Sequence, residues 1–302
     1  MSDRMSFLGV TTGSSSIMRV FPRWAKILDL PTSTLEGCDI PLDAEAERYR
    51  REVLAIRDDP AHRGALVTTH KMALFQAAAD LFDELDEFAR ACGEISSISK
   101  RGDRLHGHAK DPVTAGLALE EFLPVDAFDG RREAIVLGAG GAGLALSWLL
   151  AEREDRPRRI VVTDTEESRL AHLRAVHARR GTPEVLLETV RADDASTAAL
   201  LDGAPAGSLV VNASGLGKDR PGSPVPQGAR FPRGAYVWEF NYRGSLEFWH
   251  QARAQAEARG LHVEDGWRYF LHGWSQVIVE VFDLDLTPAL LEELAEAAQG
   301  VR

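Results

Sequence analysis

The stretch EAIVLGAGGAGLALSWLL, from Glu133 to Leu150, decides the fold. It predicts a short buried strand, a glycine-rich turn and an apolar helix. Gly138, Gly140 and Gly143 have the G-x-G-x-x-G spacing of a dinucleotide-binding turn. The first glycine permits the tight turn, the second lets the backbone approach a pyrophosphate, and the third lets the helix pack closely on the strand. The N-terminus of that helix offers unpaired N–H groups to phosphates.

Two further strands complete the predicted cofactor site. The strand from Arg159 to Thr163 ends in Asp164, where an acidic side chain accepts hydrogen bonds from the adenine ribose. A later strand, 208–212, ends in small residues suited to lie against a nicotinamide ribose. From Arg131 onward strands alternate with helices, which predicts a parallel, doubly wound sheet. The predicted cofactor-binding residues are Gly138, Gly140, Gly141, Gly143, Asp164, Asn212, Ala213 and Gly215.

The bulk composition argues against several other classes of protein. With 302 residues the chain is long enough for two domains, and its formal charge of -11 argues against a nucleic-acid surface. Two cysteines without C-x-x-C spacing and nine histidines without ligand spacing indicate no metal site. No apolar run reaches the roughly 18 residues of a membrane span, and the first residues lack a signal-peptide core. We therefore predict a cytoplasmic protein with neither nucleic-acid nor membrane partners.

A run of serines follows the first predicted strand, 7–11. Apolar residues at helical spacing over 17–28 predict an amphipathic helix directly after it. Ser14 and Ser16 therefore lie at a strand-to-helix junction. A helix N-cap and a ligand contact are both open for them.

Two charged residues follow strands in the same half of the chain. Lys71 comes after the buried strand 64–69, at the carboxyl edge where α/β folds place functional groups. A cation is poorly placed at the start of a helix, here an amphipathic helix predicted for 74–88, which favours a functional role over a solvated lysine. Asp111 follows a predicted pair of strands, 95–108, and either caps the next helix or faces Lys71.

Taken in order, these motifs resemble the shikimate/quinate dehydrogenase family along nearly the full length of the chain. The matching segments are Ser14 to Ser16 (S-x-S), Val67 to Lys71 (V-T-x-P-x-K, one residue shorter), Gly93 to Ser97 (G-A-x-N-T, with Ser96 for the asparagine), Gly107 to Asp111 (G-x-N-T-D), Asn212 to Gly217 (N-A-T-P-L-G), Glu239 to Tyr242 (D-x-V-Y), and Gln276. An ordered set of motifs is far more specific than the glycine turn alone.

The resemblance implies a catalytic pair, Lys71 and Asp111, that acts on a hydroxyl of a ring substrate. Hydride transfer from a secondary alcohol leaves a carbonyl, so a group must take the hydroxyl proton. Lys71 suits this role if partial burial lowers its pKa, while Asp111 orients the lysine and the hydroxyl. The cofactor performs the difficult step. The substrate-binding residues that the resemblance implies are Ser14, Ser16, Thr68, Ser96, Tyr242 and Gln276.

Departures from the family motifs leave the substrate open. Ser96 replaces the usual asparagine, and the glycine that follows the aspartate is displaced to Gly116. Both changes lie in the part of the predicted site that binds the ring hydroxyls. The leading hypothesis is a dehydrogenase of a shikimate- or quinate-like polyhydroxylated carbocycle. The alternatives are a reductase of an aminoshikimate or valienone-type cyclitol ketone in secondary metabolism, and a catalytically silent NAD-binding sensor.

The residues after the second strand of the dinucleotide motif predict the cofactor. NADP-preferring members of the family carry N-R-T there, where the arginine meets the 2′-phosphate. This chain has Thr163, Asp164 and Thr165, followed by two glutamates. A carboxylate repels a phosphate, so we predict NAD, with NADP less favoured because Arg169 offers an alternative phosphate contact.

The predicted fold is α/β, with an N-terminal α/β substrate domain and a Rossmann-type, doubly wound dinucleotide-binding domain. We place the substrate domain at residues 1–126, completed by C-terminal helices at 265–302, and the NAD(P)-binding domain at 127–264. The active site is expected in the cleft between them, where ligands commonly bind. Whether the protein forms a homodimer stays open.

Overall fold

The computed structural model describes residues 3–218 and 220–301, and these fall into two compact units. Unit 1 comprises the described residues up to Lys110 and those from Leu271 onward, and unit 2 runs from Asp111 to Phe270. Each unit is built on a six-stranded sheet, so the predicted α/β fold with two sheets is confirmed. The functional boundaries at 126/127 and 264/265 stay predictions.

Unit 1 contains a mixed sheet in the order β2-β1-β3-β5-β6-β4. Its strands are β1 (Arg4–Gly9), β2 (Leu35–Asp39), β3 (His62–Val67), β4 (Glu84–Leu85), β5 (Ser97–Arg101) and β6 (Arg104–His108). Its helices are α1 (Ile17–Ile27), α2 (Ala46–Asp58), α3 (Lys71–Ala78), α4 (Glu87–Cys92) and α12 (Pro288–Ala298), together with the later part of α11 (Trp267–Phe282). The strands β1, β2 and β3 are parallel, whereas β5 runs antiparallel to β3 and to β6.

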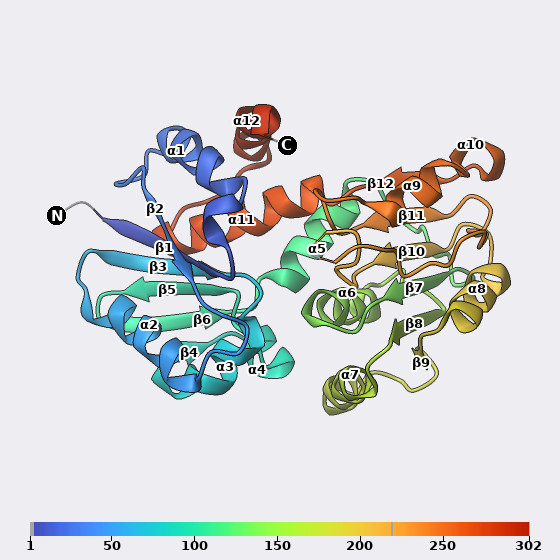
Figure 1. Ribbon diagram of the computed structural model, residues 1–302, viewed down its shortest axis with the longest axis horizontal. Coiled ribbons are helices and arrows are strands. Elements are labelled where there is room, and N and C mark those ends of the chain that lie inside the picture. The colour runs from blue at the N-terminus through green and yellow to red at the C-terminus, as the bar shows by residue number, and fades with distance from the viewer. Residues whose placement is uncertain (1–2, 219, 302) are drawn as a thin grey trace. The chain divides into compact units, whose positions relative to one another are not determined.

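Alternation along β1 explains why helices cover both faces of this sheet (Figure 1). Leu8 belongs to the core cluster that α2 and α3 complete with Tyr49 and Leu74. The side chain of its neighbour Phe7 points to the opposite face of the sheet. There its ring packs edge to face on the ring of Trp274 on α11, with 4.9 Å between centroids. Both side chains are buried, so this strand is apolar on two sides, as expected of a parallel strand between helices.

The helix predicted for 74–88 is wrong as a single element. The helix α3 ends at Ala78, and a 3-10 turn, the short strand β4 and the helix α4 follow. Asp86 starts α4, because its carboxylate accepts a hydrogen bond from Ala89 N at 2.6 Å. The helical spacing misled because Leu81, Phe82 and Leu85 all pack against the same core although they lie outside any α-helix.

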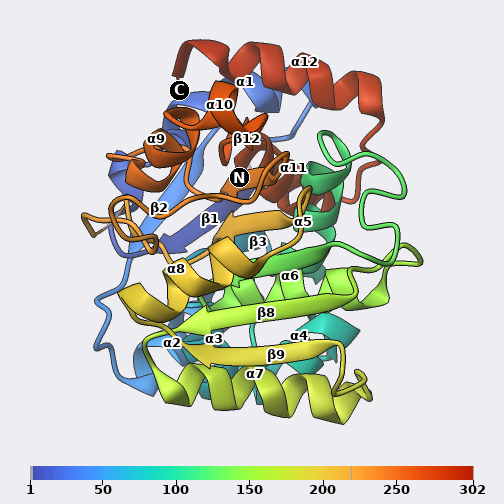
Figure 2. The ribbon, with the colours of Figure 1, turned by 90° about the vertical axis from the view of Figure 1, so that its right-hand side faces the viewer.

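Unit 2 contains an all-parallel sheet in the order β12-β11-β10-β7-β8-β9 (Figure 1). The strands β8 and β9 and the helix α7 face the viewer in Figure 2. Its strands are β7 (Glu133–Leu137), β8 (Arg159–Asp164), β9 (Leu187–Arg191), β10 (Leu209–Asn212), β11 (Tyr236–Glu239) and β12 (His262–Glu264). Its helices are α5 (Asp111–Glu120), α6 (Gly141–Glu152), α7 (Glu167–Arg180), α8 (Asp194–Gly203), α9 (Glu247–Arg253), α10 (Ala256–Arg259) and the start of α11. The predicted doubly wound sheet is thus confirmed.

The strand order of unit 2 reverses between β7 and β10. All five residues of β7 and all four of β10 are buried, so these two strands form the centre of the unit. In open α/β sheets, ligands bind beyond the carboxyl ends of the strands at this reversal point. Separately, none of the helices in the described part of the chain is long and apolar enough to cross a membrane.

Candidate active site

Two of the three glycines in the turn of unit 2 occupy positions that have no room for a Cβ atom. Gly138 has φ +121°, and a Cβ atom there would lie 2.6 Å from the carbonyl carbon of Ala213. A Cβ at Gly143 would lie 1.9 Å from the carbonyl oxygen of Gly138. At Gly140, by contrast, a Cβ would meet nothing within 4 Å. The first and third glycines therefore permit close packing, while the second borders open space.

That open space adjoins the N-terminus of α6. Gly140 is the N-cap residue and has no side chain to accept hydrogen bonds from the first turn. The first N–H groups of a helix have no partner within it, and the helix dipole places positive charge there. The residues present therefore fit the pyrophosphate of a dinucleotide.

Asp164, at the end of β8, is held beside this turn. Its Oδ2 accepts a hydrogen bond from Ala139 N at 2.8 Å, and its Oδ1 accepts one from Glu166 N at 2.9 Å. The side chain is buried, and the guanidinium of Arg169 lies 3.7 Å from Oδ2. A carboxylate is thus fixed where the sequence predicts the adenine ribose.

The segment after β10 lies against the glycine turn, as the contact between Gly138 and Ala213 shows. Ala213 N donates to Leu137 O at 2.9 Å, and Gly215 has φ +76° with open space around it. Asn212 is fully buried, and its Oδ1 accepts hydrogen bonds from the backbone N and the hydroxyl of Ser214. The side chain of Asn212 therefore serves the protein interior.

Glu239, at the end of β11, is a residue whose importance the sequence did not reveal. It is fully buried, and its carboxylate accepts three hydrogen bonds: from Asn212 Nδ2 at 2.8 Å, from Asn241 N at 2.8 Å and from Asn241 Nδ2 at 2.7 Å. Burial raises the pKa of Glu239 to about 7, although these hydrogen bonds oppose the shift. The only sequence signal is its place in the segment that resembles D-x-V-Y.

Tyr242 lies three residues after Glu239. Its ring packs against Phe270, with 4.3 Å between centroids, and against Trp267 at 5.7 Å. Both neighbours belong to the first turns of α11. The predicted substrate residue Tyr242 is thus part of an aromatic cluster in unit 2.

In unit 1, Lys71 is the first residue of α3, four positions after the end of β3, and it is half-buried. Its carbonyl accepts a hydrogen bond from Ile95 N at 3.1 Å, and Val67 N donates to Ser96 O at 2.9 Å. The structure therefore brings the main chain at Lys71, Thr68 and Ser96 together at the carboxyl edge of β3. The hydroxyl of Thr68 donates to Leu8 O at 3.3 Å.

His70, which precedes Lys71 in the chain, has a hydrogen-bond partner on each ring nitrogen. It is buried, with Nδ1 at 2.9 Å from the Tyr49 hydroxyl and Nε2 at 2.8 Å from Ile40 O. One ring nitrogen is therefore hydrogen-bonded to α2 and the other to the residue that follows β2. His70 has a structural role, consistent with its pattern of partners.

The two predicted serines differ in their surroundings. Ser14 is exposed, and its hydroxyl donates to Thr11 O at 3.0 Å within the turn. Ser16 is buried at the N-cap position of α1, yet its side chain makes no capping hydrogen bond. The N-cap alternative therefore does not account for Ser16. Its role toward a ligand stays a prediction.

Ser96 is occupied inside unit 1. It is buried, its hydroxyl donates to His108 O at 3.3 Å, and it accepts a hydrogen bond from Lys110 N at 2.7 Å. Lys110 also pairs through Nζ with Glu280 Oε2 at 2.7 Å. Glu280 lies one turn after the predicted substrate residue Gln276 on α11. The side chain of Gln276 is half-buried. Ser96 thus anchors the chain that leads into Asp111.

Asp111 is buried and begins α5, with Pro112 as the second residue. Its carbonyl accepts a hydrogen bond from the hydroxyl of Thr114 at 3.2 Å, within the first turn. Both members of the predicted catalytic pair therefore start helices, Lys71 in unit 1 and Asp111 in unit 2.

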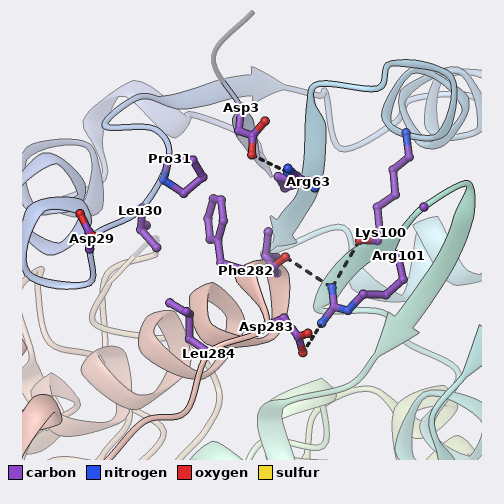
Figure 3. Close-up of a pocket in the computed structure, with 12 residues that line it drawn as sticks. Asp3, Asp29, Leu30, Pro31, Arg63, Lys100, Arg101, Phe282, Asp283 and Leu284 are labelled. Atoms are coloured by element: carbon purple, nitrogen blue, oxygen red, sulfur yellow. Dashed lines mark hydrogen bonds and ion pairs between the residues drawn. The ribbon is translucent and has the colours of Figure 1, made fainter.

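A cavity of about 310 Å³ in unit 1 is lined by none of the predicted site residues (Figure 3). Lys100 donates to Ile56 O, Arg57 O and Asp59 O, and Arg101 points from β5 to Asp283 at 3.3 Å. Lys100 thus caps the carboxyl end of α2, and the lining of this cavity shares no residue with the predicted site. Among the described residues, no three His, Cys, Asp or Glu side chains form a metal-binding group.

Comparison with known proteins gives a consistent set of similarities, although no protein-family model matches the chain. The shikimate dehydrogenase (NADP(+)) of Streptococcus gordonii is 31% identical over 170 residues, which are 55% of this chain and 55% of that protein. The matched region thus spans little more than half the length of this curated relative.

Two solved structures are similar over the whole chain. Shikimate 5-dehydrogenase of Thermus thermophilus, in complex with NADP(H) and shikimate, is 25% identical with a TM-score of 0.72, covering 98% of this chain and 99% of that one. Quinate dehydrogenase of Corynebacterium glutamicum, in complex with NAD, has a TM-score of 0.75 at 19% identity and covers 98% of both chains. The second likeness is one of fold alone.

Proposed function

We propose that the chain is a member of the shikimate/quinate dehydrogenase family of NAD(P)-dependent oxidoreductases, and that it interconverts a secondary alcohol and a ketone on a shikimate- or quinate-like polyhydroxylated carbocycle. The observation that carries this proposal is the position of Lys71 and Asp111, each at the first residue of a helix. The open space beside Gly140 supports the cofactor part.

The proposed catalytic pair lies at two helix N-termini, Lys71 on α3 and Asp111 on α5. The positive end of a helix dipole is an unfavourable place for a cation and a favourable one for an anion. A neutral amine accepts the proton of the substrate hydroxyl, and a carboxylate orients the amine and that hydroxyl by accepting their hydrogen bonds. A bound nicotinamide accepts or supplies the hydride.

The surroundings of Ser96 favour a second candidate substrate. Because its hydroxyl serves the main chain at His108 and Lys110, Ser96 is unlike an asparagine that grips ring hydroxyls. The remaining proposed substrate residues are Ser14, Ser16, Thr68, Tyr242 and Gln276. This pattern fits a differently substituted ring, such as an aminoshikimate or a valienone-type cyclitol ketone of secondary metabolism.

For the cofactor we propose NAD in preference to NADP. Asp164 is a buried carboxylate with a backbone donor on each oxygen, so its negative charge is firmly placed. Arg169 pairs with that carboxylate at 3.7 Å, which reduces its attraction for a 2′-phosphate. NADP remains the less favoured alternative.

The test is to measure the absorbance of reduced nicotinamide with NAD or NADP and a panel of shikimate, quinate, aminoshikimate and valienol-type cyclitols. The variants Lys71→Met and Asp111→Asn should each lower kcat by about 10² to 10⁴. Their matched controls, Lys26→Met and Asp202→Asn, remove the same groups from exposed positions and should leave turnover unchanged.

Each outcome of the panel selects one hypothesis. Turnover of shikimate or quinate supports the leading proposal, and turnover of a cyclitol alone supports the second candidate. Binding of NADH without turnover of any compound would support the catalytically silent sensor. Full activity of Lys71→Met or Asp111→Asn would remove that residue from the mechanism.

A further inference from the structure

The side chains of Asn212, Glu239 and Asn241 hold the four residues after Asn212 in place. Leu216 O accepts hydrogen bonds from Asn212 Nδ2 at 3.2 Å and from Asn241 Nδ2 at 3.1 Å. The same two amides donate to the carboxylate of Glu239. Asn212 Oδ1 in turn accepts from Ser214, so the buried Glu239 orients the two amides that hold Ser214 and Leu216.

This segment, residues 213–216, lies next to the glycine turn, because a Cβ at Gly138 would meet the backbone of Ala213 and Ser214 at 2.6 to 2.7 Å. A ligand that fills the space beside Gly140 therefore extends toward it. Gly215, with open space around it, is the part of the segment that a ligand can approach. The conformation of the segment should consequently decide how well the nicotinamide half of a dinucleotide is held.

We propose that Glu239 is a positioning residue for the nicotinamide half of the cofactor, and that its ionised form holds residues 213–216 in the binding conformation. This inference rests on the proposed function only in requiring that unit 2 binds a nicotinamide dinucleotide. Glu239 itself is fully buried and acts on the ligand through Asn212 and the segment, not directly.

The charge state of Glu239 matters because every group that faces it is a donor. The carboxylate accepts from Asn212 Nδ2, Asn241 N and Asn241 Nδ2, and no charged side chain of the described residues contributes to its pKa, which burial raises to about 7. A protonated carboxyl must donate its own proton, so it conflicts with one of these donors. If Asn212 rotates to offer Oδ1 instead, it gives up both hydrogen bonds to Ser214.

The experiment measures the dissociation constants of NADH and of ADP by fluorescence and calorimetric titration between pH 6 and 9. ADP probes the glycine turn and Asp164 without reaching residues 213–216. In the wild type, NADH binding should weaken as the pH falls through about 7, while ADP binding should not follow this profile. In Glu239→Gln, which places an amide donor against the asparagines, NADH should bind about tenfold more weakly at pH 8, with a flat pH profile.

Two further variants make the result decisive. Glu239→Asp keeps the negative charge and should retain the pH dependence with intermediate affinity. Glu184→Gln removes a carboxylate from an exposed position of unit 2 and should behave as the wild type. If Glu239→Gln does not fold, the wild-type and Glu239→Asp profiles still decide, because a flat NADH profile in both overturns the proposal.

Other outcomes also overturn it. Equal weakening of NADH and ADP in Glu239→Gln would mean a general loss of structure in unit 2, and unchanged NADH binding would mean that the network does not act on the cofactor. NADH binding that depends on Glu239, without turnover of any carbocycle, would keep this inference and refute the proposed reaction. Absence of NADH binding in the wild type would refute both.

Discussion

The two units define their parts of the proposed site by different means. In unit 2 the backbone does so: three glycines, two of them too crowded for a Cβ and one bordering open space, shape the turn. In unit 1 the candidate residues are polar side chains, and several of them, including Ser96 and Thr68, already bond to the main chain. A site defined by the backbone can be predicted from the sequence because few residue types permit its shape. A side-chain hydroxyl is harder to interpret, because it can donate to a main-chain carbonyl as well as to a ligand.

The largest effect should come from the crowded glycines of unit 2. In Gly143→Ala the new methyl group would lie 1.9 Å from Gly138 O, so the turn must move. We expect the free energy of unfolding to fall by about 3 kcal/mol and cofactor binding to be lost. In Gly140→Ala the methyl group meets no protein atom and φ is -73°, so stability should be kept while the methyl group obstructs the pyrophosphate.

Urea unfolding and NADH titration of these two variants separate the role of Gly143 in packing from the role of Gly140 in binding the pyrophosphate. Gly140→Ala is the matched control for Gly143→Ala, since both add one methyl group to the same turn. Unimpaired NADH binding by Gly140→Ala would show that the space beside it is not the pyrophosphate site.

A pH experiment compares the units through one buried histidine in each. Burial lowers the pKa of His62 in unit 1 and of His177 in unit 2 to about 4 from 6.5. The unfolded chain gains protons below pH 6.5 and the folded chain only near pH 4, so stability falls as the pH drops between these values. The loss is roughly 3 kcal/mol for each histidine at most.

Urea unfolding at about pH 7, 5.5 and 4.5 checks this prediction. His62→Gln and His177→Gln should each make stability less sensitive to acid, each through its own unit. Glu239, with a raised pKa, contributes the opposite slope: its stabilising contribution is complete below pH 4.5 and is lost as the pH rises through about 7. An acid sensitivity that neither histidine variant reduces would contradict the assignment.

Ser96 distinguishes a structural from a substrate-binding hydroxyl in unit 1. Ser96→Ala leaves the N–H of the partly buried Lys110 without its acceptor, which should lower stability by about 1 to 2 kcal/mol. Ser97→Ala is the control, because the Ser97 hydroxyl is fully buried and has no hydrogen-bond partner among the described residues. A raised KM without a lowered Tm in Ser96→Ala would support the substrate role instead.

The smallest expected effect concerns cofactor choice in unit 2. Asp164→Asn removes the negative charge while one oxygen still accepts a hydrogen bond from Ala139 N or Glu166 N. The ratio of kcat/KM for NADPH to that for NADH should rise about fivefold, because the repulsion of a 2′-phosphate is removed. Steady-state kinetics with both cofactors decide this, and an unchanged ratio would locate the discrimination elsewhere.

The sequence predicted the alternation of strands and helices in unit 2 and the α/β character of unit 1, because glycine spacing and apolar runs constrain both. It did not predict the break after Ala78, since Leu81, Phe82 and Leu85 reach the same core from a turn and a strand as they would from a helix. It also did not predict that Asn212 and Ser96 face inward. Which partner a polar side chain takes depends on neighbours far away in sequence, such as Glu239 for Asn212.

Unit 2 is one uninterrupted run of chain from Asp111 to Phe270, whereas unit 1 is assembled from segments on either side of it. Within unit 1 these segments are joined firmly, as Trp24 Nε1 on α1 donates to Leu294 O on α12 at 2.8 Å. In genetic terms unit 2 is a single insertion with two junctions. A recombined gene that replaces 111–270 with the corresponding segment of an NADP-dependent relative is therefore expected to exchange cofactor choice while both ends of the coding sequence stay unaltered.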